Sequence, residues 1–340
     1  MRVPAARGPL TTELLAALAG APGPVPDVVR AAREAVGRAT DVLADEDVQL
    51  ALFVLYELHY RGIDGVDDAW EWQPDLLAAR AVLEDAFERS VRALVQVPDR
   101  EPRTAAEVAE ALFELTDADD GPSVSTYVAK RATDAQLHEF VIHRSIYHLK
   151  EADPHSWALP RLVGRAKSAL IEVQADEYGG GRPGHIHSEL FAGTMRALGL
   201  DDSYGAYVDA VPAPTLANVN LMSLFGLHRR LRGAIVGHLA AFEMTSSIPC
   251  RKYGNGFRRL GYGQDVTFYF DEHVEADAVH EQIAGRDLAG GLVEAEPDLA
   301  DDVLWGAAAY LAVDGLAGAQ MLGAWQAGQS ALRSPVAAAA

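Results

Sequence analysis

The hydrophobic positions along this chain recur mostly with the helical spacing of three and four residues, and few segments alternate as a β-strand does. Glycine-rich breakers at 179–184 and 254–263 separate the helical segments. We expect residues 265–270 to be an extended lead-in to the helix that follows them. The pattern predicts an all-α protein with helices at about 11–19, 27–44, 47–60, 74–96, 104–117, 134–150, 158–177, 185–198, 203–210, 214–230, 231–247, 271–287 and 302–326.

Composition limits the classes of protein to consider. The chain has 340 residues, 49% of them apolar, which is enough for a sizeable core. Its formal net charge of −20, from 29 basic and 49 acidic residues, argues against nucleic acid and anionic membrane surfaces as partners. No apolar run reaches the length of a membrane span, and the N-terminus lacks the apolar region of a signal peptide. We therefore expect a cytoplasmic protein.

The single cysteine, Cys250, cannot form a disulfide within the chain, which fits a reducing cytoplasm. It follows the sequence Ser-Ser-Ile-Pro at 246–249, and no residue near it in the sequence is an obvious general base that could activate the thiol. We expect an ordinary thiol just past the end of a helix rather than a nucleophile.

The acidic loop 117–121 lacks the spacing of an EF-hand and is expected to be a solvated boundary between two helical parts. The predicted division is an N-terminal helical section, residues 1–125, a helical core, residues 126–330, and a flexible tail, residues 331–340. The N-terminal section would support the core and contribute to a homodimer, because symmetric dimers are the commonest oligomers.

The most informative stretch is His273-Val-Glu-Ala-Asp277-Ala-Val-His280. At 3.6 residues per turn, positions i, i+4 and i+7 fall on one stripe of a helix. Two imidazoles and a carboxylate would then project side by side, which is costly to bury unless something binds them. A mixed nitrogen and oxygen set suits a first-row transition metal, iron or manganese, more than calcium.

Further candidate ligands occur in segments that can converge on this stripe. Glu177 ends one predicted helix, His187 opens the next beyond the glycine run, and Glu243 lies among apolar neighbours. Three histidines and three carboxylates on a helical bundle are what a dinuclear iron or manganese site needs. Taken alone, Glu243 would instead be a buried salt bridge, with Arg251 as its partner. The chain has no pair of Glu-x-x-His motifs, so it is not ferritin-like.

Other histidines carry less information. His138, His143 and His148 are five residues apart, which rotates them off a common helix face, so we interpret them as ordinary core or surface residues. His228 is followed by Arg229, Arg230 and Arg232, and the positive charge of these arginines would repel a metal cation. His238 is expected to have a structural role or to support a ligand.

The runs 172–181, 185–191, 237–243 and 270–280 together resemble the haem-oxygenase-like di-iron oxidases and oxygenases, often called iron-containing redox enzymes. The resemblance covers about residues 130–330, and residues 58–72 are similar to a segment found in longer members. It implies a haem-oxygenase-like helical bundle of about seven core helices without haem, preceded here by extra N-terminal helices. The ligands that it implies are Glu177, His187, Glu243, His273, Asp277 and His280.

One departure narrows the resemblance. Many members place the first glutamate and histidine seven residues apart on one helix, whereas Glu177 and His187 are ten apart across a glycine turn. This resembles the subset that oxidises nitrogen, which carries an additional carboxylate ligand. Our candidate for that ligand is Glu151, whose alternative role is a surface acid at a helix end.

The resemblance implies an O2-dependent non-haem di-iron oxygenase that N-oxygenates a small primary amine or amino-acid-like molecule in a biosynthetic pathway. The product would be a hydroxylamine, with further oxidation to nitroso or nitro, through a peroxo-di-iron(III) intermediate. Two iron ions, O2 and an external electron donor, a reductase or a chemical reductant, would be needed. One alternative is a di-iron oxidase that desaturates, or cleaves C–C bonds in, an amino or fatty acid. The other is a non-redox binding protein on the same fold.

Residues around this site are expected to hold the substrate and orient the ligands. Arg229 or Arg230 would bind a substrate carboxylate, although both are equally good surface arginines. Asp271 and Glu275 would orient histidine rings. An apolar pocket would be lined by Tyr178, Phe191, Phe242, Met244 and Phe270.

Overall fold

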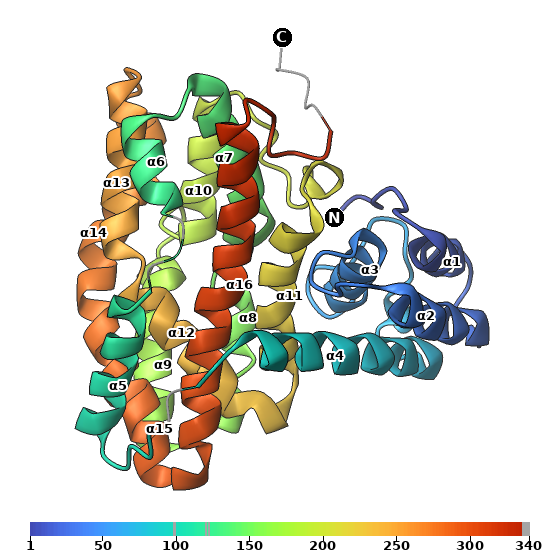
Figure 1. Ribbon diagram of the computed structural model, residues 1–340, viewed down its shortest axis with the longest axis horizontal. Coiled ribbons are helices and arrows are strands. Elements are labelled where there is room, and N and C mark those ends of the chain that lie inside the picture. Colours follow the sequence, from blue (N-terminus) through green and yellow to red (C-terminus); the bar gives the residue numbers. More distant parts are fainter. Residues whose placement is uncertain (98–99, 120, 122, 335–340) are drawn as a thin grey trace.

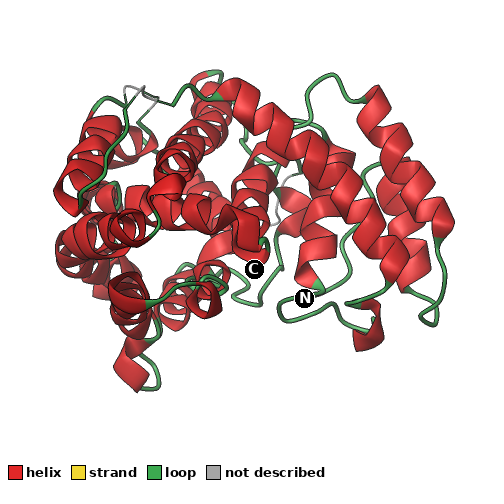
Figure 2. Cartoon of the chain, turned by 90° about the horizontal axis from the view of Figure 1, so that it is seen from below, coloured by secondary structure: helices red, strands yellow, loops and turns green. Residues whose placement is uncertain are grey.

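The computed structural model describes residues 1–97, 100–119, 121 and 123–334, apart from the side chains of residues 275–278. Within these residues the chain forms helices and loops and no strand (Figure 2). The all-α prediction is therefore confirmed. None of the helices in this part of the chain is both long and apolar enough to cross a membrane.

The α-helices are α1 (Pro9–Leu18), α2 (Pro26–Arg38), α3 (Glu46–Glu57), α4 (Pro74–Leu94), α5 (Ala105–Asp117), α6 (Val124–Lys130), α7 (Asp134–His148), α8 (Asp153–Ser156), α9 (Gly164–Glu177), α10 (His187–Ala197), α11 (Ala213–Leu227), α12 (Arg232–Met244), α13 (Ser247–Arg259), α14 (Gln264–Gln282), α15 (Gly290–Ala295) and α16 (Ala300–Gln326). Short 3-10 helices are η1 (Asp68–Trp70), η2 (Leu159–Arg161), η3 (Gly179–Gly181), η4 (Val208–Ala210), η5 (Arg229–Leu231) and η7 (Pro297–Leu299). A π-helix, η6 (Ile283–Ala289), continues α14.

The long helices of the core stand side by side in a bundle, and α1, α2 and α3 form a separate group beside it (Figure 1). Helix α4 runs from this group to the bundle and packs on α2, α3 and α16. Within the bundle, α12 packs on α16 and α14, and α14 also packs on α13 and α10. Helix α14, which carries the histidine stripe, is thus surrounded by other core helices.

Glycines bring α12 and α16 into backbone contact. A Cβ on Gly237 would lie 1.8 Å from the carbonyl oxygen of Val303, and one on Gly306 would lie 2.1 Å from that of Ala234. Since neither position has room for a side chain, the two glycines set how closely the helices approach. This packing fixes the position of α12, which carries Glu243.

Helix α13 corrects two expectations. We predicted residues 254–263 to be a breaker, but α13 continues to Arg259. Gly256 lies within it because a Cβ there would approach the carbonyl oxygen of Val128 on α6 to 2.7 Å, so the glycine permits close packing of two helices. Cys250 also lies within α13 and not past a helix end.

The segment 265–270 also differs from expectation, because it forms the first turns of α14 rather than an extended lead-in. Its β-branched and aromatic composition resembles a strand. Its buried residues, Val266, Tyr269 and Phe270, nevertheless have the i, i+3, i+4 spacing of a helix. The helix predicted at 203–210 is also wrong, since only the 3-10 turn η4 forms there.

A buried ion pair joins the N-terminal helices to the core. Lys150, in the turn that follows α7, donates from Nζ to Oε1 of Glu57 at the end of α3. Both side chains are almost completely buried, and Nζ also lies 4.2 Å above the centre of the Tyr60 ring. The division of the chain at residues 125 and 330 remains a prediction, while this pair shows where α3 contacts the core.

Candidate metal centre

Six buried side chains form two groups whose possible ligand atoms lie within 4.8 Å of one another in each group. They come from four helices, α9, α10, α12 and α14, and from the turn that holds Glu151, and Glu177 belongs to both groups. The first group is Glu151, Glu177, His187 and His273, and the second is Glu177, Glu243 and His280.

The glycine-rich loop brings Glu177 and His187 together. Glu177 is the last residue of α9 and His187 the first of α10. Gly179 has a φ of +70°, and a Cβ on it would lie 2.6 Å from the backbone carbonyl carbon of His185. Only glycine allows the chain to turn back on itself this tightly. As a result, Nδ1 of His187 lies 3.0 Å from Oε2 of Glu177.

Glu151 lies in the turn between α7 and α8 and is held from two sides. The hydroxyl of Tyr269 donates to both carboxylate oxygens, at 2.9 and 2.8 Å, and Nδ1 of His148 lies 2.8 Å from Oε1. The next residue, Ala152, has a φ of +72°, a conformation that side chains rarely adopt. Burial alone would raise the pKa of the Glu151 carboxyl, but His148 and His273 lower it well below its usual range.

Hydrogen bonds on the far side of two rings select the nitrogen that faces the cluster. Nδ1 of His273 donates to the backbone carbonyl of Tyr269 at 2.8 Å, which directs Nε2 toward Glu151, 3.7 Å away. Nε2 of His280 donates to Asp176 at 3.1 Å, which directs Nδ1 toward Glu243, 3.5 Å away. Such outer partners orient the imidazole ligands of metal sites.

The second group is an ion pair when no cation is bound. Burial would lower the pKa of His280, but Glu243 and Asp176 raise it to about 9. Burial also raises the pKa of the Glu243 carboxyl, and His280 offsets this only in part. A cation that binds Nδ1 of His280 must therefore displace a proton.

The donor set fits a pair of first-row metal ions. Nδ1 of His187 is buried and makes no hydrogen bond within the described part of the chain, although a carboxylate oxygen is 3.0 Å away. A metal ion between these two atoms would satisfy both. Three imidazoles with three carboxylates are ligands that iron and manganese accept, and a shared carboxylate such as Glu177 can bridge two ions.

The structure therefore brings together Glu151, Glu177, His187, Glu243, His273 and His280, which the sequence nominated. The side chains of Asp277, the remaining nominated ligand, and of Glu275 lie outside the described residues. Glu243 faces His280 rather than Arg251, whose side chain is exposed. Asp271 does not orient a histidine ring but pairs with Arg258.

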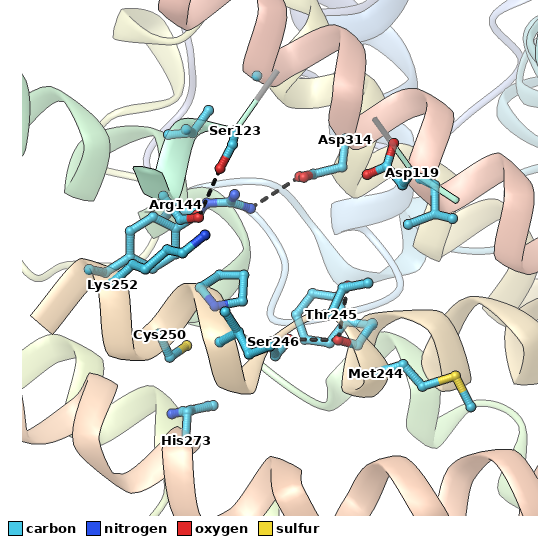
Figure 3. A pocket seen from close by; sticks show the side chains of 18 of the residues that line it. Asp119, Ser123, Arg144, Met244, Thr245, Ser246, Cys250, Lys252, His273 and Asp314 are labelled. Atoms are coloured by element: carbon cyan, nitrogen blue, oxygen red, sulfur yellow. Dashed lines mark hydrogen bonds and ion pairs between the residues drawn. The ribbon is translucent and has the colours of Figure 1, made fainter. Parts of the chain in front are cut away.

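A cavity of about 400 Å³ reaches the first group of clustered side chains, at Glu151 and His273. Glu151, His148, Tyr269 and His273 line it at one end, and helices α12, α13 and α16 supply much of its wall (Figure 3). Its volume lies in the range of small-molecule sites, about 300–1,000 Å³. Phe242, Met244 and Phe270 contribute to the lining as we expected, but Tyr178 and Phe191 do not.

The arginines nominated to hold a substrate lie elsewhere. Arg230 makes an ion pair with Glu88 at an exposed position, and neither Arg229 nor Arg230 lines this cavity. The cations that do line it are Arg144 and Lys252.

Sequence reasoning missed three residues that support the ligands: His148, Tyr269 and Asp176. Each of them had a local signal in the sequence. His148 precedes Glu151 by three residues, within one turn, and Asp176 is adjacent to Glu177. Tyr269 lies four residues before His273, the spacing that places two side chains on one helix face.

Comparison with known proteins gives this site a family. The family described as iron-containing redox enzyme matches residues 138–315, which include all six clustered side chains. Nitrosourea synthase from Streptomyces achromogenes subsp. streptozoticus is 31% identical over 151 residues, 44% of this chain and 32% of that protein. The chain thus spans about a third of the length of this curated relative. Because the family match extends over more than half of its residues, the chain belongs to the iron-containing redox enzymes, whose fold is a haem-oxygenase-like helical bundle.

Proposed function

We propose that this protein is a non-haem di-iron oxygenase that uses O2 to oxidise the nitrogen of a small primary amine to a hydroxylamine, and further to nitroso or nitro. The observation that carries the proposal is the pair of buried ligand groups that share Glu177. The additional carboxylate, Glu151, favours the nitrogen-oxidising subset of the family. A nitrosourea contains a nitroso group on nitrogen, so the name of the curated relative points the same way.

The residues divide between two ions. Glu151, His187 and His273 would hold one, Glu243 and His280 the other, and Glu177 would bridge them. Asp277 remains a proposed ligand on α14. When bound, iron would supply the redox chemistry with O2. Hydroxylation of an amine consumes O2, two electrons and two protons and yields the hydroxylamine and water. The electrons come from an external donor, a reductase or a chemical reductant.

The protein determines how a substrate approaches. Among the clustered side chains, Glu151 and His273 line the cavity, whereas Glu243 and His280 do not. An amine therefore reaches the centre from the side of Glu151. Phe242, Met244 and Phe270 give the cavity apolar surface, which favours the neutral amine whose lone pair is oxidised. A homodimer in the cytoplasm remains part of this proposal.

Anaerobic loading with Fe(II), followed by exposure to O2 with a panel of primary amines, tests the proposal. We expect about two irons per chain and hydroxylamine, nitroso or nitro products by mass spectrometry. Glu177→Gln should lower iron binding at both positions, while Glu172→Gln, an exposed acid on the same helix, should leave it unchanged. Iron uptake with products oxidised only at carbon would refute N-oxygenation in favour of desaturation or C–C cleavage. Absence of iron uptake would refute the di-iron site itself.

A further inference from the structure

Lys252 places a positive charge in the wall of the cavity. It lies on α13, and its Nζ donates to the hydroxyl of Thr126 at 3.0 Å. In the part of the chain that the structure describes, no carboxylate lies within ion-pair distance of Nζ. The hydroxyl partner leaves the charge of this lysine uncompensated.

The other cation of the cavity is already neutralised. Arg144 makes an ion pair with Asp314 at 3.2 Å, and Asp314 also accepts a hydrogen bond from Asn218 at 2.8 Å. Arg144 and Asp314 therefore form a closed polar unit with no net charge. In a chain with a net charge of −20, a cavity lysine without an acidic partner is a specific feature, and it calls for an anion.

The cavity then has two chemically different regions. His273 and Glu151 mark the region of the metal centre, while Lys252 and Arg144 are drawn away from His273 in Figure 3, with Cys250 between them in this view. A ligand that fills the cavity would present one group to the centre and another to Lys252. Apolar side chains, including Phe242 and Met244, suit a short carbon chain between those groups.

We propose that Lys252 binds the carboxylate of the substrate, which makes the substrate an amino carboxylic acid rather than a simple alkylamine. This inference rests on the proposed function, because it assigns the amine end to the metal centre. A monoanion matches one lysine. A phosphate dianion would demand more donors, and Asp117 and Asp119, two exposed acids that also line the cavity, would repel its double charge more strongly than a monoanion.

Binding to the anaerobic, iron-loaded protein tests the proposal without turnover. The probes are β-alanine, γ-aminobutyrate, δ-aminovalerate and ε-aminocaproate, each compared by calorimetry with the unsubstituted alkylamine of the same carbon number. At least one amino acid should bind more tightly than its alkylamine. Lys252→Met should weaken that binding by about 10- to 100-fold, the range for loss of a charge-assisted hydrogen bond, and leave alkylamine binding unchanged. Lys252→Arg should retain most of the preference.

Lys130→Met is the matched control, since Lys130 is an exposed lysine on α6 outside the cavity. Equal binding of amino acids and alkylamines by the wild type, or an unchanged preference in Lys252→Met, would overturn the inference. Iron counted in the same samples separates this outcome from failure of the proposed function. If the protein takes up no iron, the comparison of wild type with Lys252→Met on the metal-free protein still decides whether Lys252 binds a carboxylate.

Discussion

Asp176 accepts a hydrogen bond from Nε2 of His280 at 3.1 Å, and this bond determines that Nδ1 of the same ring faces Glu243. Asp176 is adjacent to Glu177, so the last turn of α9 supplies both the proposed ligand that the two groups share and the hydrogen-bond partner that orients another proposed ligand, His280. A carboxylate behind an imidazole also makes the ring a stronger donor to a metal ion.

Replacement of Asp176 by asparagine should therefore weaken iron binding without removing a ligand. Loss of an outer partner typically costs 10- to 100-fold in metal affinity, and we expect about tenfold here because the Asp176 side chain is 62% exposed and water screens its charge. Competition with a chelator measures the affinity. Glu172→Gln, one turn earlier on α9, is the control. Equal affinities for wild type and Asp176→Asn would show that this hydrogen bond does not orient a ligand.

Gly179→Ala should disrupt the site through the backbone. The new Cβ would lie 2.6 Å from the carbonyl carbon of His185, so the loop must shift and carry His187 away from Glu177. Gly181→Ala is a matched control. Its φ of +72° imposes a similar conformational cost, about 1–2 kcal/mol, but nothing lies within 4 Å of its Cβ position. We expect Gly179→Ala to lower both iron binding and the free energy of unfolding more than Gly181→Ala. Identical effects would assign the whole cost to the dihedral angle.

The pair between Lys150 and Glu57 should contribute strongly to stability because both groups are buried. Removal of one partner, as in Glu57→Gln or Lys150→Met, leaves a buried charge and should cost about 3–5 kcal/mol of unfolding free energy. The double variant should lose much less than the sum. Asp287→Asn breaks the exposed pair with Arg165 and should cost less than about 1 kcal/mol. Urea unfolding of the five proteins measures these values, and additive losses would contradict a direct interaction.

His143 should make the protein less stable in mild acid. Burial, together with the nearby charge of Arg144, lowers the pKa of this imidazole to about 3, whereas an unfolded histidine titrates near 6.5. Between these values the unfolded state binds the additional proton, so the contribution of His143 is complete above pH 6.5. It falls by about 1.4 kcal/mol for each pH unit below that value. His143→Gln should thus flatten the decline of stability between pH 6.5 and 4.5.

The control for this pH dependence is His185→Gln, which changes an exposed side chain. The difference in slope between wild type and variant is the measured quantity, because carboxyl groups elsewhere contribute equally to both. If His143→Gln and wild type decline in parallel, the imidazole is protonated in the folded protein and the argument from burial fails.

Local patterns predicted most of the long helices. They failed where a glycine could be either a helix breaker or a packing residue, and where aromatic residues could belong to either a strand or a helix. Gly256 resembles a breaker until one sees that α6 packs against it. Tyr269 and Phe270 resemble a strand until their spacing from Val266 is compared with a helix. For Gly256 a contact with another part of the chain, Val128, decided the structure, and that contact has no local signature. For residues 265–270 the helical spacing was present in the sequence, but the β-branched and aromatic composition obscured it.

The clustering of six of the proposed ligands could be predicted for a different reason, because chemistry limits which side chains can share a buried site. The spacing of His273 and His280 predicted one helix. The glycine run after Glu177 predicted a turn that returns the chain toward it. The substrate side was not predictable. Arg230 was nominated because it lies in a basic cluster of the sequence, whereas the charge that faces the cavity, Lys252, has Arg251 as its only charged neighbour in the sequence.

The ion pair of Lys150 and Glu57 would couple iron binding to helices that contain none of the proposed ligands. Lys150 precedes Glu151, and Glu57 ends α3, so a metal ion that holds Glu151 also holds the residue to which the N-terminal helices are attached. A ligand that binds only the folded state stabilises everything that unfolds with its site. Iron should therefore slow the cleavage of α1–α3 by trypsin in the wild type, and should protect them less when Glu57 is glutamine. The stability of the first three helices would then depend on whether iron is bound by side chains much further along the chain.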